Sequence, residues 1–122
     1  GCIGTLEATH PTLAEEIINN AISAGTRDPR FPSIHRNELA ELSVSVDILG
    51  PLEAVTSEDE LDPHHYGVVV SAGDKRGVLL PNLEDIDTVE MQLRVAKHKA
   101  GINRFRPVTL QRFEVIRYGE EE

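Results

Sequence analysis

The stretch YGVVVSAGDKRGVLL, residues 66–80, decides the fold class of this chain. Two strand-like runs, at 66–72 and 77–80, flank the connection at 73–76, which begins with glycine. Apolar runs joined by a short connection that contains glycine are typical of a β-hairpin. The stretch therefore predicts two adjacent antiparallel strands.

Further strands are predicted on both sides of this hairpin. Residues 42–48 alternate apolar and polar side chains, as a half-buried strand does. Residues 108–118 predict one final strand. Ser57 followed by Glu60 has the spacing of a capping box, so a short helix is predicted over residues 57–61.

Two helices are predicted, one before and one after the hairpin. The first enters at Thr9-His10-Pro11 and ends at Gly25, because proline favours the first turn and glycine the end of a helix. Its predicted apolar face consists of Leu13, Ile17, Ile18, Ala21 and Ile22. The second runs from about Val89 to Ala100 and stops at Gly101. Its predicted inner face consists of Val89, Leu93, Ala96 and Ala100.

Two helices among mostly hairpin-linked strands predict an α+β fold with a mainly antiparallel sheet, not a doubly wound parallel sheet. The length of 122 residues is that of one ordinary domain. No run approaches the ~20 apolar residues that a bilayer-spanning helix requires. A single cysteine cannot form an internal disulfide, which fits a reducing cytosol, so we expect a cytoplasmic protein.

The charge balance argues against nucleic acid as a partner. The net charge is −9, from 21 acidic and 12 basic residues, and such an average field repels a phosphate backbone. The glycines of residues 73–77 lack the spacing of a phosphate-cradling loop, and no helix is predicted directly after them. We therefore expect neither nucleic acid nor a membrane as partner, and we predict no cofactor.

Cys2 is the first candidate for reactive chemistry. Its glycine neighbours leave a sulfur approachable. A nucleophilic cysteine needs a cation, a helix N-terminus or an imidazole nearby, and the nearest histidine, His10, lies across a turn. The alternative is a small buried residue packed against another backbone, which spacing alone favours because free cysteines are often buried.

The loop Arg27-Asp28-Pro29-Arg30-Phe31-Pro32 is the second candidate. Its arginines and aspartate, held by rigid prolines, are suited to form a fork that binds a carboxylate or a phosphate. The alternative is an internal salt bridge between Asp28 and Arg30, with Phe31 plugging the loop into the core. The residues alone leave both alternatives open, since rigid loops often carry function.

Asp62-Pro63-His64-His65 is the candidate for a metal site, and we predict none. Adjacent histidines in an extended segment point to opposite faces, so they rarely bind one ion together. His35 and His98 are too scattered along the chain to complete a ligand set. Solvated loop histidines are the better interpretation.

Several stretches, taken in order, carry a family resemblance. They are Gly1-Cys2-Ile3-Gly4, Asp28-Pro29-Arg30-Phe31-Pro32, Val44-Ser45-Val46 through Gly50-Pro51, Gly77-Val78-Leu79-Leu80-Pro81, Lys99-Ala100-Gly101 and Arg112-Phe113-Glu114. In this order they resemble the AMMECR domain family, known in bacteria and archaea as AmmeMemoRadiSam system protein A. The match spans essentially the whole chain, and the ordered set is highly specific although each piece alone is weak.

The resemblance implies a fold and a candidate site. The family is α+β with two unequal subdomains and a cleft between them, and its biochemical activity is not established. Its Gly-Cys-Ile-Gly motif is a candidate catalytic or binding site, which carries over to Gly1, Cys2, Ile3 and Gly4. Its bacterial members are associated with a Memo-like protein and a radical-SAM protein, which implies one component of a shared modification or biosynthetic pathway.

The resemblance also implies something about the extent of the domain. In family members, the cysteine motif is preceded by Leu-Arg and by an N-terminal region of helix and strand. We therefore expect residues 1–122 to form a single AMMECR-type domain that lacks this region.

Two hypotheses about function follow. The first is an enzyme or enzyme component with Cys2 as nucleophile or transient carrier and Arg30 orienting an anionic group. It predicts that the thiolate forms more readily than in a free cysteine. The second is a noncatalytic binding or scaffold module for the Memo-like and radical-SAM proteins, favoured by the absence of a base beside Cys2. Asp28 belongs to the candidate binding residues in the first hypothesis.

Overall fold

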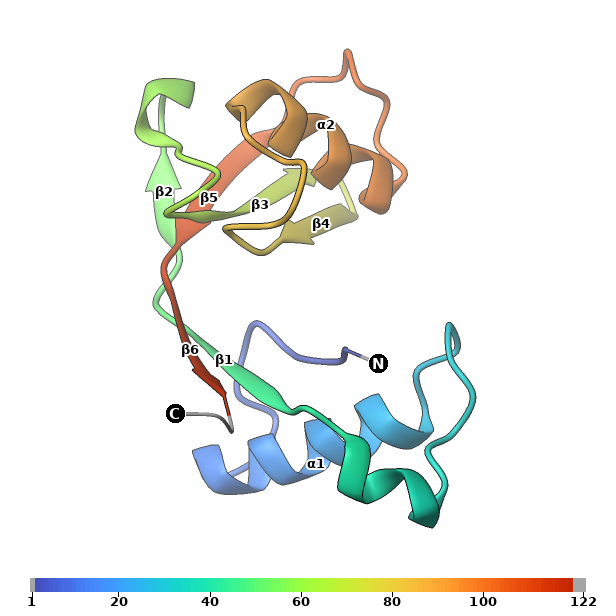
Figure 1. Ribbon diagram of the computed structural model, residues 1–122. Helices are drawn as coiled ribbons and strands as arrows, with labels where there is room; N and C mark the ends of the chain where they lie inside the picture. The colour runs from blue at the N-terminus through green and yellow to red at the C-terminus, as the bar shows by residue number, and fades with distance from the viewer. Residues whose placement is uncertain (1, 120–122) are drawn as a thin grey trace. The chain divides into compact units, whose positions relative to one another are not determined.

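An antiparallel sheet of four strands, in the order β2-β5-β3-β4, holds the core of the protein. The structure is a computed structural model that describes residues 2–119 (Figure 1). The four strands are β2 (Glu53–Val55), β5 (Thr109–Phe113), β3 (Gly67–Ala72) and β4 (Lys75–Leu79). Together with two main helices, this sheet confirms the predicted α+β class.

The central hairpin is confirmed. In β3 and β4, Val69 lies opposite Val78 and Ala72 lies opposite Lys75, so only Gly73 and Asp74 form the turn. Gly73 adopts a φ of +62°, which favours glycine. Because the turn is this tight, β4 begins at Lys75 and not at Gly77 as predicted.

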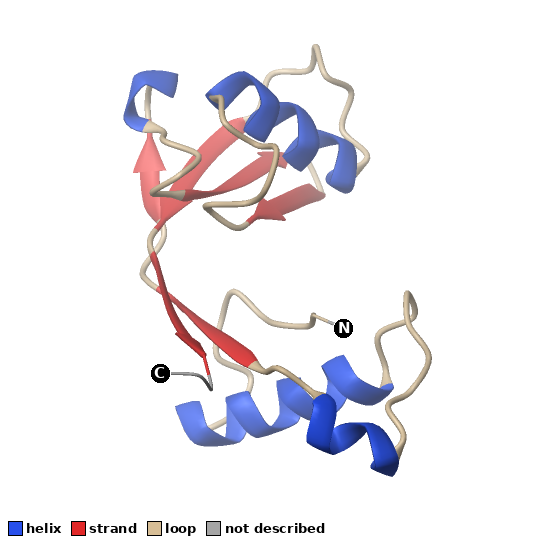
Figure 2. Ribbon diagram, in the orientation of Figure 1, coloured by secondary structure: helices blue, strands red, loops and turns tan. Residues whose placement is uncertain are grey.

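The second helix, α2 (Val89–Ala100), lies along one face of this sheet (Figure 2). Its bounds are those predicted. Thr88 caps its beginning by accepting a hydrogen bond from the N–H of Met91 at 3.1 Å. Gly101 ends it with a left-handed φ of +70°, and its N–H donates to the carbonyl of His98 at 3.1 Å.

The core lies between α2 and the sheet. The buried apolar residues all fall between Leu61 and Phe113, and three consecutive valines of β3 have no exposed surface. The cluster on the helix side of the sheet comprises Leu61, Val68, Val70, Ala72, Leu79, Ala96 and Ile102. Gly77 of β4 allows the close approach of α2, since a Cβ there would collide with the carbonyl oxygen of Ala96.

The prediction of one final strand over residues 108–118 is wrong. The segment forms two strands, β5 and β6 (Val115–Gly119), which belong to different sheets and are separated at Glu114. The carbonyl of Glu114 instead accepts a hydrogen bond from the N–H of Gly50 at 2.8 Å. Sequence pattern alone did not reveal this break, because apolar residues continue across it.

β6 pairs with β1 (Ser45–Leu49) in a second, two-stranded sheet. The strand predicted over residues 42–48 is therefore confirmed with later bounds. An ion pair supports this sheet: the guanidinium of Arg117 donates from Nε and Nη2 to the two carboxylate oxygens of Asp47, at 2.7 and 2.9 Å. Bidentate pairing of this kind fixes the register as well as adding energy.

Two short 3₁₀ helices complete the elements. The first, η1 (Arg36–Glu41), was not predicted. The second, η2 (Glu58–Glu60), confirms the predicted capping box, because the Glu60 side chain accepts from the backbone N–H of Ser57 at 3.3 Å. Strand β2 was also missed, and at Glu53–Val55 it is too short to show an alternation.

The first helix, α1 (Leu13–Thr26), begins later than predicted and continues past Gly25. Thr12 caps its beginning by accepting a hydrogen bond from the N–H of Glu15 at 3.2 Å. The predicted stop at Gly25 is one residue early, because this glycine does not adopt the left-handed φ of a helix-ending glycine and the helix continues to Thr26. A Cβ on Gly25 would lie 3.3 Å from the side chain of Ile34.

The chain divides into two compact units. One comprises Gly1–Val46 with Tyr118–Glu122, and the other Asp47–Arg117. The core described above belongs entirely to the second unit. Among the described residues of the first unit, no apolar side chain is buried.

Most of the apolar face predicted for α1 is exposed, and Ile17 is half-buried. The exposed fractions are 57% for Leu13, 58% for Ile18 and 48% for Ile22. In residues 2–119, no helix is long and apolar enough to cross a membrane.

Candidate functional site

Cys2 is exposed, so the buried alternative favoured by spacing alone is wrong. The sulfur is accessible because the segment around it packs loosely. Ile3 is 38% exposed, and a Cβ placed on Gly4 would meet nothing within 4 Å. The prediction for Gly1 falls outside the described residues.

The backbone of Cys2 is nevertheless held firmly, by the loop that follows α1. Its N–H donates to Oδ2 of Asp28 at 3.0 Å, and its carbonyl accepts from Nη2 of Arg30 at 3.1 Å. The two segments singled out in the sequence therefore lie together. Hydrogen bonds join Cys2, Asp28 and Arg30 into one cluster.

The loop owes its shape to an internal ion pair. Arg30 donates to both carboxylate oxygens of Asp28, from Nε at 3.0 Å and from Nη2 at 2.7 Å. The backbone N–H of Arg30 adds a third bond, to Oδ1 at 3.0 Å. The Asp28 side chain is 1% exposed and that of Arg30 is 64% exposed. The internal salt bridge, one of the two alternatives for this loop, is thus present.

One part of that alternative is wrong. Phe31 does not plug the loop into the core, because it is 56% exposed. Its ring instead lies 5.7 Å from the guanidinium carbon of Arg30. With no buried apolar residue in this unit among those described, the core that the prediction assumed does not exist here.

The electrostatics of the site follow from these contacts. The hydrogen bonds from the Arg30 side chain, followed by those from the backbone N–H groups of Cys2 and Arg30, hold the pKa of Asp28 well below its usual value. Hydrogen bonding to Asp28 raises the pKa of Arg30, and the charge of a Cys2 thiolate raises it further. An ionised carboxylate and an ionised guanidinium are therefore both hydrogen-bonded to the backbone of Cys2.

Arg30 is consequently committed within the loop. Its Nε and Nη2 are occupied by Asp28 and by the carbonyl of Cys2, so only Nη1 has no hydrogen bond within residues 2–119. A fork that binds an external anion in bidentate fashion would need two parallel donors. Arg30 can offer a ligand one donor nitrogen, Nη1, which suits the orientation of an anionic group rather than its bidentate binding.

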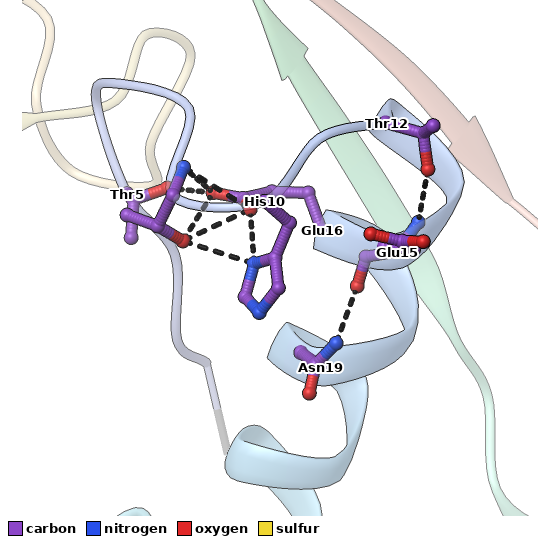
Figure 3. Close-up of polar contacts among 7 residues, drawn as sticks. Thr5, His10, Thr12, Glu15, Glu16 and Asn19 are labelled. Carbon is purple, nitrogen blue, oxygen red and sulfur yellow. Dashed lines mark hydrogen bonds and ion pairs between the residues drawn. The ribbon is translucent and has the colours of Figure 1, made fainter.

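A second polar cluster lies at the other end of α1, around Glu16 (Figure 3). The carboxylate accepts from the hydroxyl of Thr5 at 2.6 Å, from the N–H of Thr9 at 3.1 Å and from the hydroxyl of Thr9 at 3.0 Å. It also bonds Nδ1 of His10. A carboxylate only accepts, so Nδ1 carries the hydrogen, and Figure 3 shows the other ring nitrogen directed away from Glu16.

His10 is not the missing base of Cys2. The imidazole is tied to Glu16 in the first turn of α1, whereas Cys2 is tied to Asp28 beyond its last residue, Thr26. From residue 16 to residue 26, the helix rises by about 15 Å. The sequence suggested His10 as the nearest histidine, but the intervening helix keeps it away.

Glu16 is also the residue that sequence reasoning missed. Its side chain is 13% exposed, although an acidic residue in a first helical turn usually faces solvent. Hydrogen bonds from Thr5 and His10, followed by those from Thr9, lower its pKa from 4.5 to about 2. Threonines shortly before a helix N-terminus were the only signal of this cap in the sequence.

We expect the Glu16 cap to open only in strong acid. Because the pKa of Glu16 is lower in the folded chain than its ordinary value of 4.5, the carboxylate stabilises the fold above about pH 4.5. That contribution is lost as pH falls through about 2. In an NMR titration, the amide shift of Thr9 should show a midpoint near 2, and this transition should be absent from Glu16→Gln. A Thr9 midpoint near 4.5 would contradict the cap.

The adjacent histidines do not come together. His64 lies 3.4 Å from a carboxylate oxygen of Asp87, and His65 lies 3.6 Å from one of Glu114. Both side chains are more than half exposed. Across residues 2–119, no group of three or more histidine, cysteine or acidic side chains is placed to hold a metal ion.

Comparisons with known proteins give the family. A family model described as AMMECR1 matches residues 1–121. A Thermotoga maritima protein is 55% identical over 119 residues, which is 97% of this chain and 68% of that protein. A Clostridium acetobutylicum protein is 49% identical over 120 residues, or 98% of this chain and 25% of that protein. These relatives are therefore longer than the present chain.

A solved structure gives the same result. The crystal structure of an uncharacterized protein from Pyrococcus horikoshii matches 89% of this chain with a TM-score of 0.82 and 28% identity. The match covers 59% of that chain. The ordered motifs, the family model and the shared fold agree, and this chain belongs to the AMMECR1 family.

Proposed function

We propose that this protein is an enzyme or enzyme component in which Cys2 acts as a nucleophile or transient carrier. The single observation that carries the proposal is an exposed thiol whose backbone is held on both sides by the Asp28–Arg30 ion pair. The family resemblance supports a setting in an AmmeMemoRadiSam-type pathway, alongside a Memo-like and a radical-SAM protein.

The chemistry open to Cys2 is attack on an electrophilic carbon. The thiolate sulfur forms a new bond to that carbon, and the leaving group departs with the electrons of the broken bond. The thiol proton goes to water or to the substrate, because His10 is held at the other end of α1. The guanidinium of Arg30 keeps one donor nitrogen, Nη1, without a hydrogen bond within residues 2–119, and this nitrogen can orient an anionic group.

Alkylation of Cys2 tests the proposal. Because this is the only cysteine, iodoacetamide incorporation reports on it alone. We expect Arg30→Gln to slow labelling at pH 7 roughly fivefold, since the variant removes a cation and leaves the Asp28 carboxylate uncompensated. Arg30→Lys should recover most of the rate, and Arg27→Gln, an equal charge change in the same loop, should leave it unchanged. Equal rates in all four proteins would refute a role for Arg30.

Formation of the final product of the reconstituted pathway distinguishes a chemical role of Cys2 from a role in binding alone. Cys2→Ser should abolish the output of the reconstituted pathway while the circular dichroism spectrum stays that of the parent. Retained output in Cys2→Ser would refute the proposed nucleophile.

A binding or scaffold module is the second candidate, favoured by the exposed apolar face of α1. Ile18 and Ile22, one helical turn apart on α1, are each about half exposed, and neighbouring exposed apolar side chains mark protein interfaces. We propose that a partner protein of the pathway, Memo-like or radical-SAM, covers this face. The other candidate occupant is additional polypeptide of the same domain, of the kind expected before Cys2 from the family resemblance.

Copurification distinguishes the two occupants. A scaffold predicts that binding of the Memo-like or radical-SAM protein survives Cys2→Ser and is lost in Ile18→Asp. Asn19→Asp adds the same charge at a neighbouring exposed position of α1 and should retain binding. If Ile18→Asp still binds the partner protein, the partner does not cover this face of α1. Polypeptide of the same domain would then be the remaining candidate occupant.

A further inference from the structure

We infer that the end of β3 and the beginning of β5 form a second site, which binds the phosphate group of a small molecule. The site lies wholly within the unit Asp47–Arg117 and does not involve Cys2. It is an open pocket of about 410 Å³, which is within the range of small-molecule sites. Its walls are residues 71–73 and 106–109.

Strand register places polar side chains in one row beside this pocket. Ser71 lies opposite Arg76 of β4 on one side and opposite Thr109 of β5 on the other. Residues directly opposite in an antiparallel sheet share a face, with their Cβ atoms about 5 Å apart. The Cβ atoms of Arg76, Ser71 and Thr109 therefore lie in one row across three strands, with Ser71 and Thr109 in the pocket wall and Arg76 beside it.

A second guanidinium reaches the same place from the loop before β5. Nη2 of Arg106 lies 3.3 Å from the point that a Cβ on Gly73 would occupy. The absence of a side chain at Gly73 therefore leaves room for this guanidinium over the β3–β4 turn. Gly73 consequently has two roles, its positive φ in the turn and the space it leaves above it.

The loop that carries Arg106 is itself anchored. Nζ of Lys97 donates to the carbonyls of Arg104 and Arg106, at 3.0 Å each. The N–H of Arg106 donates to the carbonyl of Asn103 at 3.0 Å. An anchored loop loses less freedom when a ligand binds, so the backbone that carries this guanidinium is already in place.

The charges in the pocket favour an anion. Among residues 2–119, neither Arg76 nor Arg106 forms a side-chain ion pair, and the hydroxyls of Ser71 and Thr109 make no side-chain hydrogen bond. No acidic residue lines the pocket, although the chain carries a net charge of −9. Asp74, in the adjacent turn, pairs with neither arginine.

A phosphate group suits this donor set better than a carboxylate does. Its three oxygens can accept from two guanidinium groups and from hydroxyls at once, whereas a carboxylate offers two oxygens. The site is exposed, so binding should weaken as salt screens the charges.

Titration of the full chain with inorganic phosphate tests the site. In NMR spectra at low ionic strength, we expect saturable shifts at the amides of residues 71–73, 106 and 108–109, with acetate binding more weakly. Arg106→Gln should raise the dissociation constant about tenfold, and Arg76→Gln should raise it less. Arg27→Gln, the same charge change in the other unit, should alter it by less than a factor of two.

The outcomes separate this site from the chemistry proposed for Cys2. Cys2→Ser should bind phosphate as the parent does, because the pocket does not include that residue. Shifts that spread over all basic residues without saturation, or equal weakening by Arg106→Gln and Arg27→Gln, would overturn the inference. Acetate bound as tightly as phosphate would overturn the assigned ligand class.

Discussion

Gly77→Ala should destabilise the protein by about 3 kcal/mol or more, since inserting atoms into a closed contact forces the backbone to move. The added Cβ would collide with the carbonyl oxygen of Ala96 and would lie 2.9 Å from the Cβ of Ala100. Both neighbours belong to α2, so the helix as a whole must shift away from β4. That shift also loosens the core, because Ala96 is completely buried.

Urea denaturation with two glycine controls measures this effect. Gly101→Ala meets no neighbouring atom but imposes a side chain on a left-handed φ of +70°, and should cost about 1 kcal/mol. Gly4→Ala has open space around the new Cβ and should leave the midpoint unchanged. A loss for Gly77→Ala no larger than that for Gly101→Ala would show that α2 yields easily.

Phe113→Ala should cost about 3–5 kcal/mol, as truncation of a fully buried phenylalanine usually does. The ring packs directly on the backbone of Gly67, its cross-strand partner. Gly67→Ala should also be strongly destabilising, because its Cβ would collide with the Phe113 ring and lie 2.9 Å from the carbonyl oxygen of Leu79.

The two substitutions should be coupled. In a Phe113→Leu background, the ring that blocks the new Cβ is absent, so Gly67→Ala should cost less there than in the parent. A double-mutant cycle in urea measures this difference, and we expect a coupling of about 1–2 kcal/mol. Additive losses would mean that the Leu79 carbonyl, and not the ring, excludes a side chain at Gly67.

Local signals in the sequence predicted the helix α2 and the β3–β4 hairpin well. Gly101 and the apolar positions of α2 lie in the helix that they determine, and Gly73 lies in the turn that it determines. These elements are therefore set by residues close in sequence, which a sequence pattern can show. The break at Glu114 has a distant cause, the pairing of β5 and β6 with different sheets. No window along residues 108–118 contains that information.

In the unit that contains α1, the sequence predicted the local pattern correctly but not its burial. Helical spacing correctly predicted that α1 has an apolar face, but burial depends on what lies against the face. Here Ile18 and Leu13 are more than half exposed. A periodic pattern predicts which side of a helix is apolar and leaves the covering surface undetermined.

The sequence predicted which residues belong to the candidate site but not how they are arranged. The sequence singled out Cys2, Asp28 and Arg30, yet spacing alone favoured a buried thiol, and nothing in the pattern placed residue 2 against residues 28 and 30. That contact depends on the path of the chain around α1. The cap at Glu16 was missed for the same reason, because it joins Thr5 and Thr9 across the turn before the helix.

The two hydrogen bonds on the backbone of Cys2 limit the positions at which a partner or substrate can meet the thiol. With both its N–H and its carbonyl fixed, the sulfur retains chiefly one internal rotation, about the Cα–Cβ bond, with three staggered positions. A partner or substrate that docks on this loop therefore meets a thiol confined to a small volume. Confinement of this kind raises the effective concentration of a reacting group, which supports the role proposed for Cys2.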